Sequence, residues 1–294
     1  TQPPTVVGRV QTAAPISSGA SAAAQQTARP ERSPGWSEES HGSKAAPNYG
    51  VVFPVAAVNT ITVTITPDDW AAMQADMEEI YGAEREQVMA LAGMSAAERD
   101  AYLQQMLLQN SPEAGADAGG SGAAFRNRSP RWVPATISFQ GQEWTHVGVR
   151  YKGASSLSPW VIGDLRLPFK FDFDEFEDDY PEIKNQRFFG FKQLSLANNY
   201  QDASGMRDSL VYELLAEAGL PSLHTAPYEI VLDYGEGPIR LGLYTTVEVV
   251  DDTGVKSFFG SDDGNIYEGE GWGAALSPQD FHLIEDSFEK KNNE

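Results

Sequence analysis

The side chains best suited to chemistry follow one predicted strand. The segment VRYKGASS carries Arg150 and Lys152 two residues apart, so both side chains point to the same face of the strand. The turn that follows contains Gly153, Ser155 and Ser156, whose small size lets backbone N–H groups approach an anion closely. This combination could hold a phosphate. An ordinary hairpin turn with exposed basic residues is the alternative.

A lysine in the next strand could act on the same anion. Lys170 lies on the polar face of the alternating segment LRLPFKFDF, so it is held rigidly and could place a point charge on a phosphate. A small-residue turn, a strand lysine, a helix and a hairpin follow one another in the N-lobe of protein kinases as well. The helical acid would then be Asp208 or Glu213. Alternatively, Asp208 stabilises the helix N-terminus and Glu213 lies on an exposed face.

Metal chemistry has weaker candidates. The acidic run at 172–179 could chelate calcium, but it lacks the glycine and the spacing of an EF-hand, and a solvated acidic loop is the alternative. The four histidines form no HxxH or HExxH pair, and the chain has no cysteine. Zinc-thiolate sites, disulfides and cysteine nucleophiles are therefore excluded.

Composition limits the partners. The chain has 42 acidic and 21 basic residues, a net charge of −21, which disfavours nucleic acid and anionic membranes and favours a basic partner. Simple solubility or a salt-rich habitat would explain the charge equally well. No apolar run approaches the roughly 18 residues of a membrane span.

The elements that position these residues divide the chain into three parts. Residues 1–48 have the composition of a disordered linker, which hints at an exported protein. Residues 49–128 combine a strand from Asn59, helices at 69–81 and 84–109, and a Gly/Ala-rich loop at 110–128. A capping box at Ser95 and Glu98 breaks the second helical stretch in two.

Residues 129–294 combine hairpins with one main helix. Strands are predicted at 132–151, with a turn at Gln140–Gly141, and in the segments LRLPFKFDFDEF and KQLSLAN. The helix is predicted to begin at Ser204 and to end at Gly219. It carries an apolar stripe formed by Leu210, Val211, Leu214, Leu215 and Ala218. A second hairpin turns at 234–238. This order indicates an α+β fold with an antiparallel sheet.

Five motifs between residues 132 and 294 occur in the order of a known family. They are VRYKGASS, LPFKFDFDEF, LSLANNYQDASGMRDSLVYELLAEAGLPS, YEIVLDYGEGPIRLGLYTTVEVVDD and GNIYEGEG. Together they resemble the motifs of the CotH kinases, a bacterial family named for a spore-coat protein. The resemblance implies an atypical kinase fold: an N-lobe with an antiparallel sheet and one main helix, followed by the start of a second lobe.

The resemblance also implies a chemistry and a set of residues. The chemistry is transfer of phosphate from ATP, with Mg²⁺ or another divalent metal, to Ser or Thr of a protein. The ATP-binding residues would be Arg150, Lys152, Gly153, Ser155, Ser156, Lys170 and, near the adenine, Glu248. The supporting residues would be Asp202 and Arg207 of the D-x-S-x-x-R motif, Asp208, Glu213, and Asn265 and Tyr267 of the G-N-x-Y motif.

Two features depart from the family pattern. The lysine after the G-N-L-Y motif is Glu268 here, and the sequence stops before the half that carries the family's aspartates. Catalytic and metal-binding residues therefore stay unassigned, and the second lobe is expected to be incomplete. A non-catalytic scaffold of the cell or spore surface and a calcium-dependent binding module are the alternative functions. We expect an exported or surface-associated protein whose substrate is basic and Ser-rich.

Overall fold

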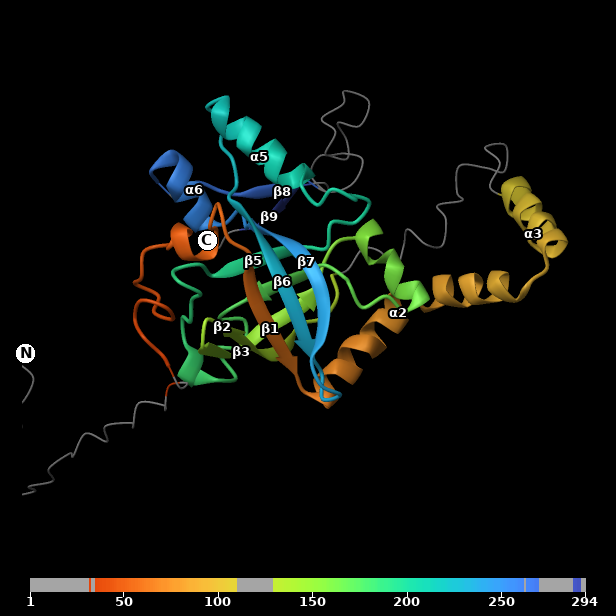
Figure 1. Ribbon diagram of the computed structural model, residues 1–294, viewed down its shortest axis with the longest axis horizontal. Helices are drawn as coiled ribbons and strands as arrows, with labels where there is room; N and C mark the ends of the chain where they lie inside the picture. The colour runs from red at the N-terminus through yellow and green to blue at the C-terminus, as the bar shows by residue number, and fades with distance from the viewer. Residues whose placement is uncertain (1–31, 33–34, 110–128, 262, 270–287, 292–294) are drawn as a thin grey trace, which may run out of the picture. The chain divides into compact units, whose positions relative to one another are not determined.

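The fold is a seven-stranded β-barrel (Figure 1). A computed structural model describes residues 32, 35–109, 129–261, 263–269 and 288–291. The strands follow one another around the barrel in the order β1-β2-β3-β4-β5-β7-β6. Their bounds are β1 Asn59–Ile65, β2 Val133–Phe139, β3 Gln142–Tyr151, β4 Phe169–Asp172, β5 Gln193–Ala197, β6 Thr225–Asp233 and β7 Ile239–Glu248.

The barrel differs from the predicted sheet in one pairing. Strands β1 and β6 pair in parallel and close the barrel, whereas its other pairs are antiparallel. The prediction of an antiparallel sheet is therefore wrong at this seam. The two strands are far apart in the sequence, so no hairpin fixes their relative direction. The fold is α+β as predicted, but this barrel does not confirm a kinase N-lobe.

Alternating strands form the core as predicted. Strand β1 buries Ile61, Val63 and Ile65, and the segment around β4 buries Phe169 and Phe171. The polar residues that alternate with these buried ones therefore point to the outside of the barrel. The hairpin turn between β2 and β3 is also confirmed, because Gln140 and Gly141 have the positive φ angles of 48° and 78° that a two-residue turn requires.

A long helix packs on the barrel. Helix α2, Pro67–Gly93, begins at the cap Thr66 and buries Met73, Met77 and Tyr81. It continues through the boundary predicted after residue 81 and ends just before Ser95, where helix α3, Ala96–Gln109, begins. The Ser95 N–H and hydroxyl both donate to Glu98, so the predicted capping box is confirmed. None of the described helices is long and apolar enough to cross a membrane.

The end of the segment predicted as linker belongs to the folded part. Ser40 and His41 are buried, and the His41 ring stacks on Trp144 at 4.3 Å. The His41 carbonyl accepts a hydrogen bond from the Arg187 N–H. Residues 40–48 thus do not behave as the predicted disordered linker. Polar residues are expected to be solvated, and here hydrogen bonds to the barrel allow their burial. Helix α1, Tyr49–Val52, follows this segment. The rest of the predicted linker lies largely outside the described residues.

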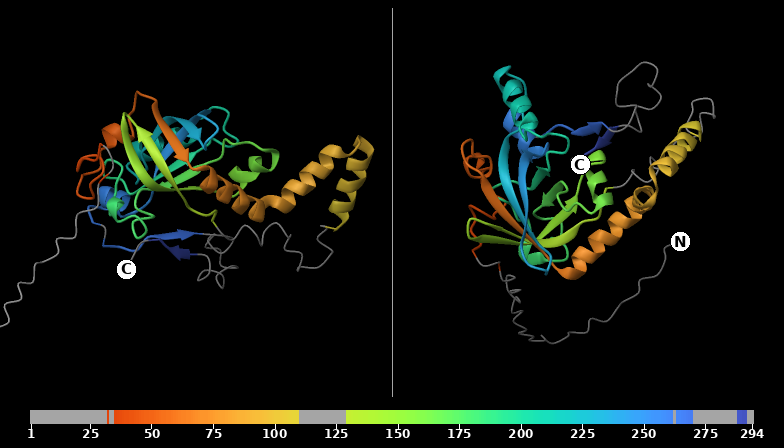
Figure 2. Two further views of the ribbon diagram at one scale, coloured as in Figure 1. Left: turned by 90° about the horizontal axis from the view of Figure 1, so that it is seen from below. Right: turned by 45° about the vertical axis from the view of Figure 1, so that its right-hand side comes forward.

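Shorter elements complete the fold. They are the 3₁₀ helices η2 Ser155–Ile162 and η3 Pro181–Ile183, helices α5 Arg207–Glu217 and α6 Asp252–Phe259, and strands β8 Tyr267–Gly269 and β9 Phe288–Lys290. Strands β8 and β9 pair with each other outside the barrel wall (Figure 2). Helix α5 begins at residue 207, with Met206 as its cap residue, so Ser204 is not the N-cap that the sequence predicted. Gly219 adopts the predicted left-handed conformation after the helix, with φ 73°.

Candidate functional site

Three cations meet on the outer face of the barrel. Arg150 on β3 lies opposite Lys170 on β4, and Lys170 lies opposite Ser195 on β5. Residues paired across strands share a face, so Arg150, Lys170 and Ser195 lie side by side on the outside of the wall. Lys152 reaches the same row, because its ammonium group donates a hydrogen bond to the Ser195 hydroxyl. We call Arg150, Lys152 and Lys170 the basic row.

The basic row is electrostatically strained. Burial lowers the pKa of Lys152, and the charges of Lys170 and Arg150 lower it further. Burial and the Arg150 charge likewise lower the pKa of Lys170. Among the described residues, no carboxylate lies within ion-pair distance of the three cations. Arg150 instead lies 4.8 Å from the Trp132 ring, and its Nε is buried without a partner. A bound anion would relieve this repulsion.

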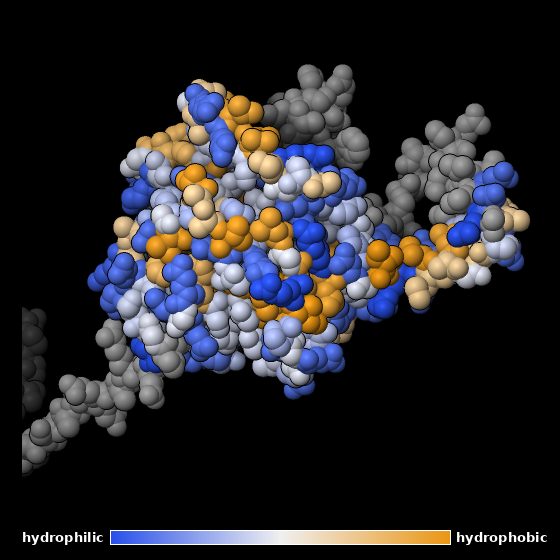
Figure 3. All heavy atoms as spheres, viewed as in Figure 1, coloured by the Kyte–Doolittle hydropathy of each residue, from blue (hydrophilic) through white to orange (hydrophobic). Residues whose placement is uncertain are grey.

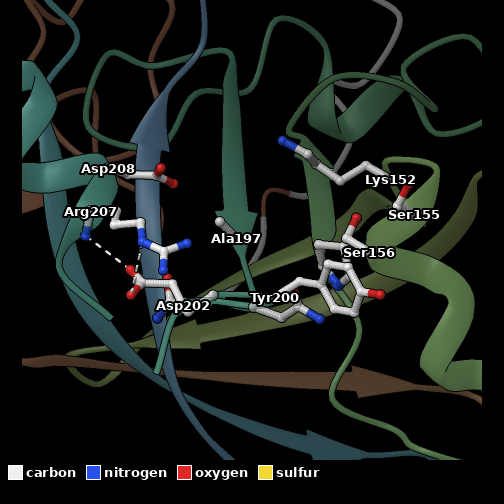
Figure 4. A pocket seen from close by; sticks show the side chains of 11 residues that line it. Lys152, Ser155, Ser156, Ala197, Tyr200, Asp202, Arg207 and Asp208 are labelled. Atoms are coloured by element: carbon white, nitrogen blue, oxygen red, sulfur yellow. Dashed lines mark hydrogen bonds and ion pairs between the residues drawn. The ribbon is translucent and has the colours of Figure 1, made fainter. Parts of the chain in front are cut away.

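A pocket of about 430 Å³ opens beside the row (Figure 4). Its volume suits a small ligand such as a nucleotide. Figure 4 shows Lys152, Ser155 and Ser156 on one side of the pocket and Asp202, Arg207 and Asp208 on the other. Pro168, Ala197, Asn198, Asn199 and Tyr200 complete the lining.

The turn on one side of the pocket depends on a glycine. Gly153 has φ 91°, a left-handed conformation that favours glycine, and a Cβ there would collide with the Ser156 hydroxyl oxygen. The turn continues into η2, where Leu157 and Trp160 are buried. The Trp160 indole N–H donates to the Gln74 side chain on α2 at 2.8 Å. The packing of η2 on α2 therefore fixes the serines at the pocket.

The opposite side is held by a carboxylate. Asp202 accepts hydrogen bonds from the Ser204 hydroxyl at 2.6 Å and from the Arg207 N–H at 2.9 Å. These bonds, the one from Ser204 first, lower the pKa of Asp202 to about 2. Asp202 therefore stays ionised and anchors the start of α5, which brings Arg207 and Asp208 to the pocket.

A comparison with protein families identifies the part of the chain that contains the pocket. Residues 149–294 match the CotH kinase protein family. This part of the chain is a CotH kinase protein domain. A search of curated proteins finds no match for the chain. The matched residues include the basic row and all the residues that line the pocket, and exclude β1, α2, α3 and β2.

Most of the site residues predicted for the CotH domain lie together. Six of them line the pocket: Lys152, Ser155, Ser156, Asp202, Arg207 and Asp208. Gly153 shapes the adjoining turn, and Arg150 and Lys170 complete the basic row. The sequence analysis missed Asn198, Asn199 and Tyr200. A run of polar residues that begins directly after β5 is the signal that could have indicated them.

Glu248, predicted near the adenine, does not line this pocket. Its side chain is only 1% exposed and lies at the end of β7. It accepts hydrogen bonds from the Tyr49 hydroxyl at 2.9 Å and, with its other oxygen, lies 2.7 Å from His224 Nδ1. The carboxylate therefore fastens α1 to the barrel. Glu213 is exposed on α5 and also lies outside the pocket lining.

Of the G-N-x-Y residues, Tyr267 begins strand β8 outside the barrel, and Asn265 lies two residues before it. The Asn265 side chain donates to the Tyr267 hydroxyl at 3.4 Å, and neither lines the pocket. Their neighbour Glu268 interacts with the basic row, since its negative charge raises the pKa of Arg150, Lys152 and Lys170 against the effect of burial. Glu268 also forms an ion pair with Lys291 at 3.1 Å.

The acidic run does not form the calcium site considered from the sequence. Among the residues that the structure describes, no group of three or more His, Cys, Asp or Glu could hold a metal ion. Asp174 forms ion pairs with Arg187 and with Lys192, the latter at 3.4 Å. Asp172 accepts a hydrogen bond from the Gln193 side chain. The two buried carboxylates thus have protein partners, and the calcium-dependent module is not supported.

Because of the buried Asp172, we expect the free energy of unfolding to depend on pH. Burial, and then Asp174, raise the pKa of Asp172 from 3.8 to about 6. The folded state thus binds this proton more tightly than the unfolded state. The stabilisation that the Asp172 proton gives the folded state is therefore complete below pH 3.8 and is lost as the pH rises through 6. Asp172→Asn, which resembles the protonated form, should raise the unfolding free energy at pH 7 by on the order of 2 kcal/mol.

Urea unfolding between pH 4 and pH 7 measures this effect. Asp174 acts in the opposite sense: burial raises its pKa, but the Asp172 hydrogen bond and the charges of Arg187 and Lys192 lower it overall. Because the two carboxyl groups are hydrogen-bonded to each other, Asp172→Asn reports the change in the pair and not in Asp172 alone. Asp178→Asn, at an exposed position of the same run, is the control and should follow wild type. Lower stability of Asp172→Asn at pH 7 would contradict the assignment.

Proposed function

We propose that the CotH domain binds ATP with its phosphates on the basic row and serves as a protein kinase that phosphorylates Ser or Thr. One observation carries the proposal. Three partly buried cations without an ion-pair partner among the described residues form one row, and one of them, Lys152, lines a pocket of nucleotide size. A polyphosphate would give these cations the close ion-pair partners that they lack among the described residues. Membership of the CotH kinase protein family supports ATP as the ligand.

Each cation is positioned by the strands. Arg150 and Lys170 lie in paired strands whose interior faces are fully buried, so their side chains start from a rigid wall. Lys152 is oriented by its hydrogen bond to Ser195. Such prepositioned charges can stabilise the charge that develops on phosphate during transfer. The small-residue turn at Gly153 would lie beside the same phosphates.

The described pocket offers one available carboxylate to the divalent metal that the family implies. Within the pocket, Asp202 is occupied by Ser204 and Arg207, which leaves Asp208 as one carboxylate. A magnesium site usually combines one or two carboxylates with substrate phosphates. The proposal therefore assigns phosphate binding and positioning to this chain, and derives no transfer step through a metal.

The acceptor protein is proposed from charge. A chain with a net charge of −21 should attract a basic, Ser-rich protein, and that attraction should weaken as salt is added. A non-catalytic scaffold that keeps the nucleotide pocket is the second candidate. It is favoured by Glu268, whose carboxylate competes with phosphate for the basic row. Transfer of labelled γ-phosphate to a serine- and lysine-rich protein would distinguish the kinase from the scaffold.

ATP should raise the melting temperature of the chain, and Lys170→Met should remove most of that increase. Losing one hydrogen bond to a charged group costs roughly 1.5–3 kcal/mol, or about tenfold or more in affinity. A thermal-shift titration with ATP measures the effect. Lys184→Met is the matched control, because Lys184 is exposed and does not line the pocket. An equal shift in wild type and Lys170→Met would place ATP elsewhere.

A further inference from the structure

Helix α5 turns its apolar residues away from the barrel. None of its residues is buried, and Leu210, Val211 and Leu214 are 48%, 53% and 63% exposed. Figure 3 shows hydrophobic side chains gathered where α5 lies, at the top of the view. The apolar stripe predicted for this helix therefore exists, but the barrel does not cover it.

The helix contacts the barrel through its other side. Ser209 accepts a hydrogen bond from the Thr225 hydroxyl at 3.1 Å, and the Ser222 hydroxyl donates to the Tyr212 carbonyl. At 100° per residue, Ser209 and Tyr212 lie opposite the centre of the Leu210–Val211–Leu214 stripe. An isolated helix of this length is marginal in water, and amphipathic helices are stabilised by burying their apolar face. The stripe thus has the properties of a docking surface.

Charge indicates what kind of partner fits. Glu213 and Glu217 lie along the edge of the stripe next to Leu210, and both are exposed. Within the part of the chain that the structure describes, neither forms an ion pair. Acidic residues that flank an apolar seam select a partner helix with Lys or Arg at the facing positions. A second copy would bring the same acids and another −21 charges, which disfavours self-association.

We propose that the outer face of α5, formed by Leu210, Val211 and Leu214 and flanked by Glu213 and Glu217, binds a basic amphipathic helix of another protein. The partner would place leucine-like side chains on the stripe and Lys or Arg beside the two glutamates. This surface is distinct from the pocket, so the proposal does not depend on ATP binding.

A pair of designed peptides tests this surface. One peptide is a helix with leucine at every third and fourth position and lysine elsewhere, and the other has glutamate in place of lysine. Fluorescence anisotropy of the labelled peptides is measured against the full chain. We expect the lysine peptide to bind and the glutamate peptide to fail. Leu214→Asp should weaken binding by about tenfold or more, since it removes an apolar contact and adds a desolvated charge.

Controls separate docking from general charge attraction. Val55→Asp introduces the same charge at a fully exposed apolar position outside α5 and should leave binding unchanged. Glu213→Lys with Glu217→Lys should reverse the preference towards the glutamate peptide. Because Leu214 is exposed, its variant should melt as wild type does. Equal binding by wild type and Leu214→Asp would overturn the proposal. So would a dimer in sedimentation that Leu214→Asp dissociates, because the occupant would then be a second copy.

Discussion

Replacing Trp144 with alanine should lower the free energy of unfolding by about 3–5 kcal/mol. The ring is fully buried and stacks on the His41 ring, with 4.3 Å between the ring centroids. The centroid of the Phe188 ring lies 4.7 Å away. Its indole N–H donates to the Arg187 carbonyl at 2.9 Å. The substitution therefore opens a cavity and removes the partner of a backbone carbonyl at once.

The same variant tests how the N-terminal segment is held. Without the Trp144 ring, His41 loses its stacking partner, so residues 40–48 should become accessible to a protease. Urea unfolding and limited proteolysis provide the two readouts. Trp132→Ala is the control, because Trp132 is only partly buried and should cost less than about 2 kcal/mol. A loss of stability in Trp144→Ala without faster cleavage at 40–48 would contradict the packing described for this segment.

The double variant Lys152→Met with Lys170→Met should lose phosphate binding without losing stability. Each lysine contributes a charged contact worth roughly 1.5–3 kcal/mol, so ATP affinity should fall by about 100-fold or more. The fold should not weaken, because methionine is of similar length and removes the mutual repulsion that lowers both pKa values. If the two lysines were purely structural, the double variant would lose stability and keep its ATP affinity.

Two measurements on the same samples decide between these patterns. Calorimetric titration gives the ATP affinity, and urea unfolding gives the stability. Lys184→Met controls for the loss of a surface lysine. If the double variant unfolds more easily and binds ATP as wild type does, the basic row is structural and the site assignment fails.

Local patterns in the sequence predicted the strands well but not their closure into a barrel. Alternation identified the buried residues of β1 and β4, because each strand has one face in the core. The parallel pairing of β1 with β6 depends on contacts between distant segments, which no local pattern encodes. The burial of His41 was missed for the same reason, since its partners Trp144 and Glu143 are far along the chain.

The stripe of α5 shows a different limit. Its spacing predicted an apolar face, and the structure has that face turned outward. Periodicity gives the existence of such a face but not what it packs against.

The site was predictable where side chains share a strand face. Arg150 lies on β3, Lys152 follows directly after the last residue of β3, and Lys170 follows the alternation of its own strand. Register then brings them together, which the sequence could suggest only through the family resemblance. The loop residues Asn198 to Tyr200 have no period, so they were missed. Glu248 occupies a strand end, and only its contacts with Tyr49 and His224 explain it.

The most direct test of the account is whether the triphosphate alone accounts for nucleotide binding. Calorimetric titration of the chain with ATP, inorganic tripolyphosphate and adenosine separates the two halves of the ligand. The basic row predicts that tripolyphosphate binds and displaces ATP, that adenosine binds far more weakly than ATP, and that Lys152→Met with Lys170→Met removes the phosphate-dependent part. Adenosine binding as tightly as ATP, unchanged in that variant, would contradict the account.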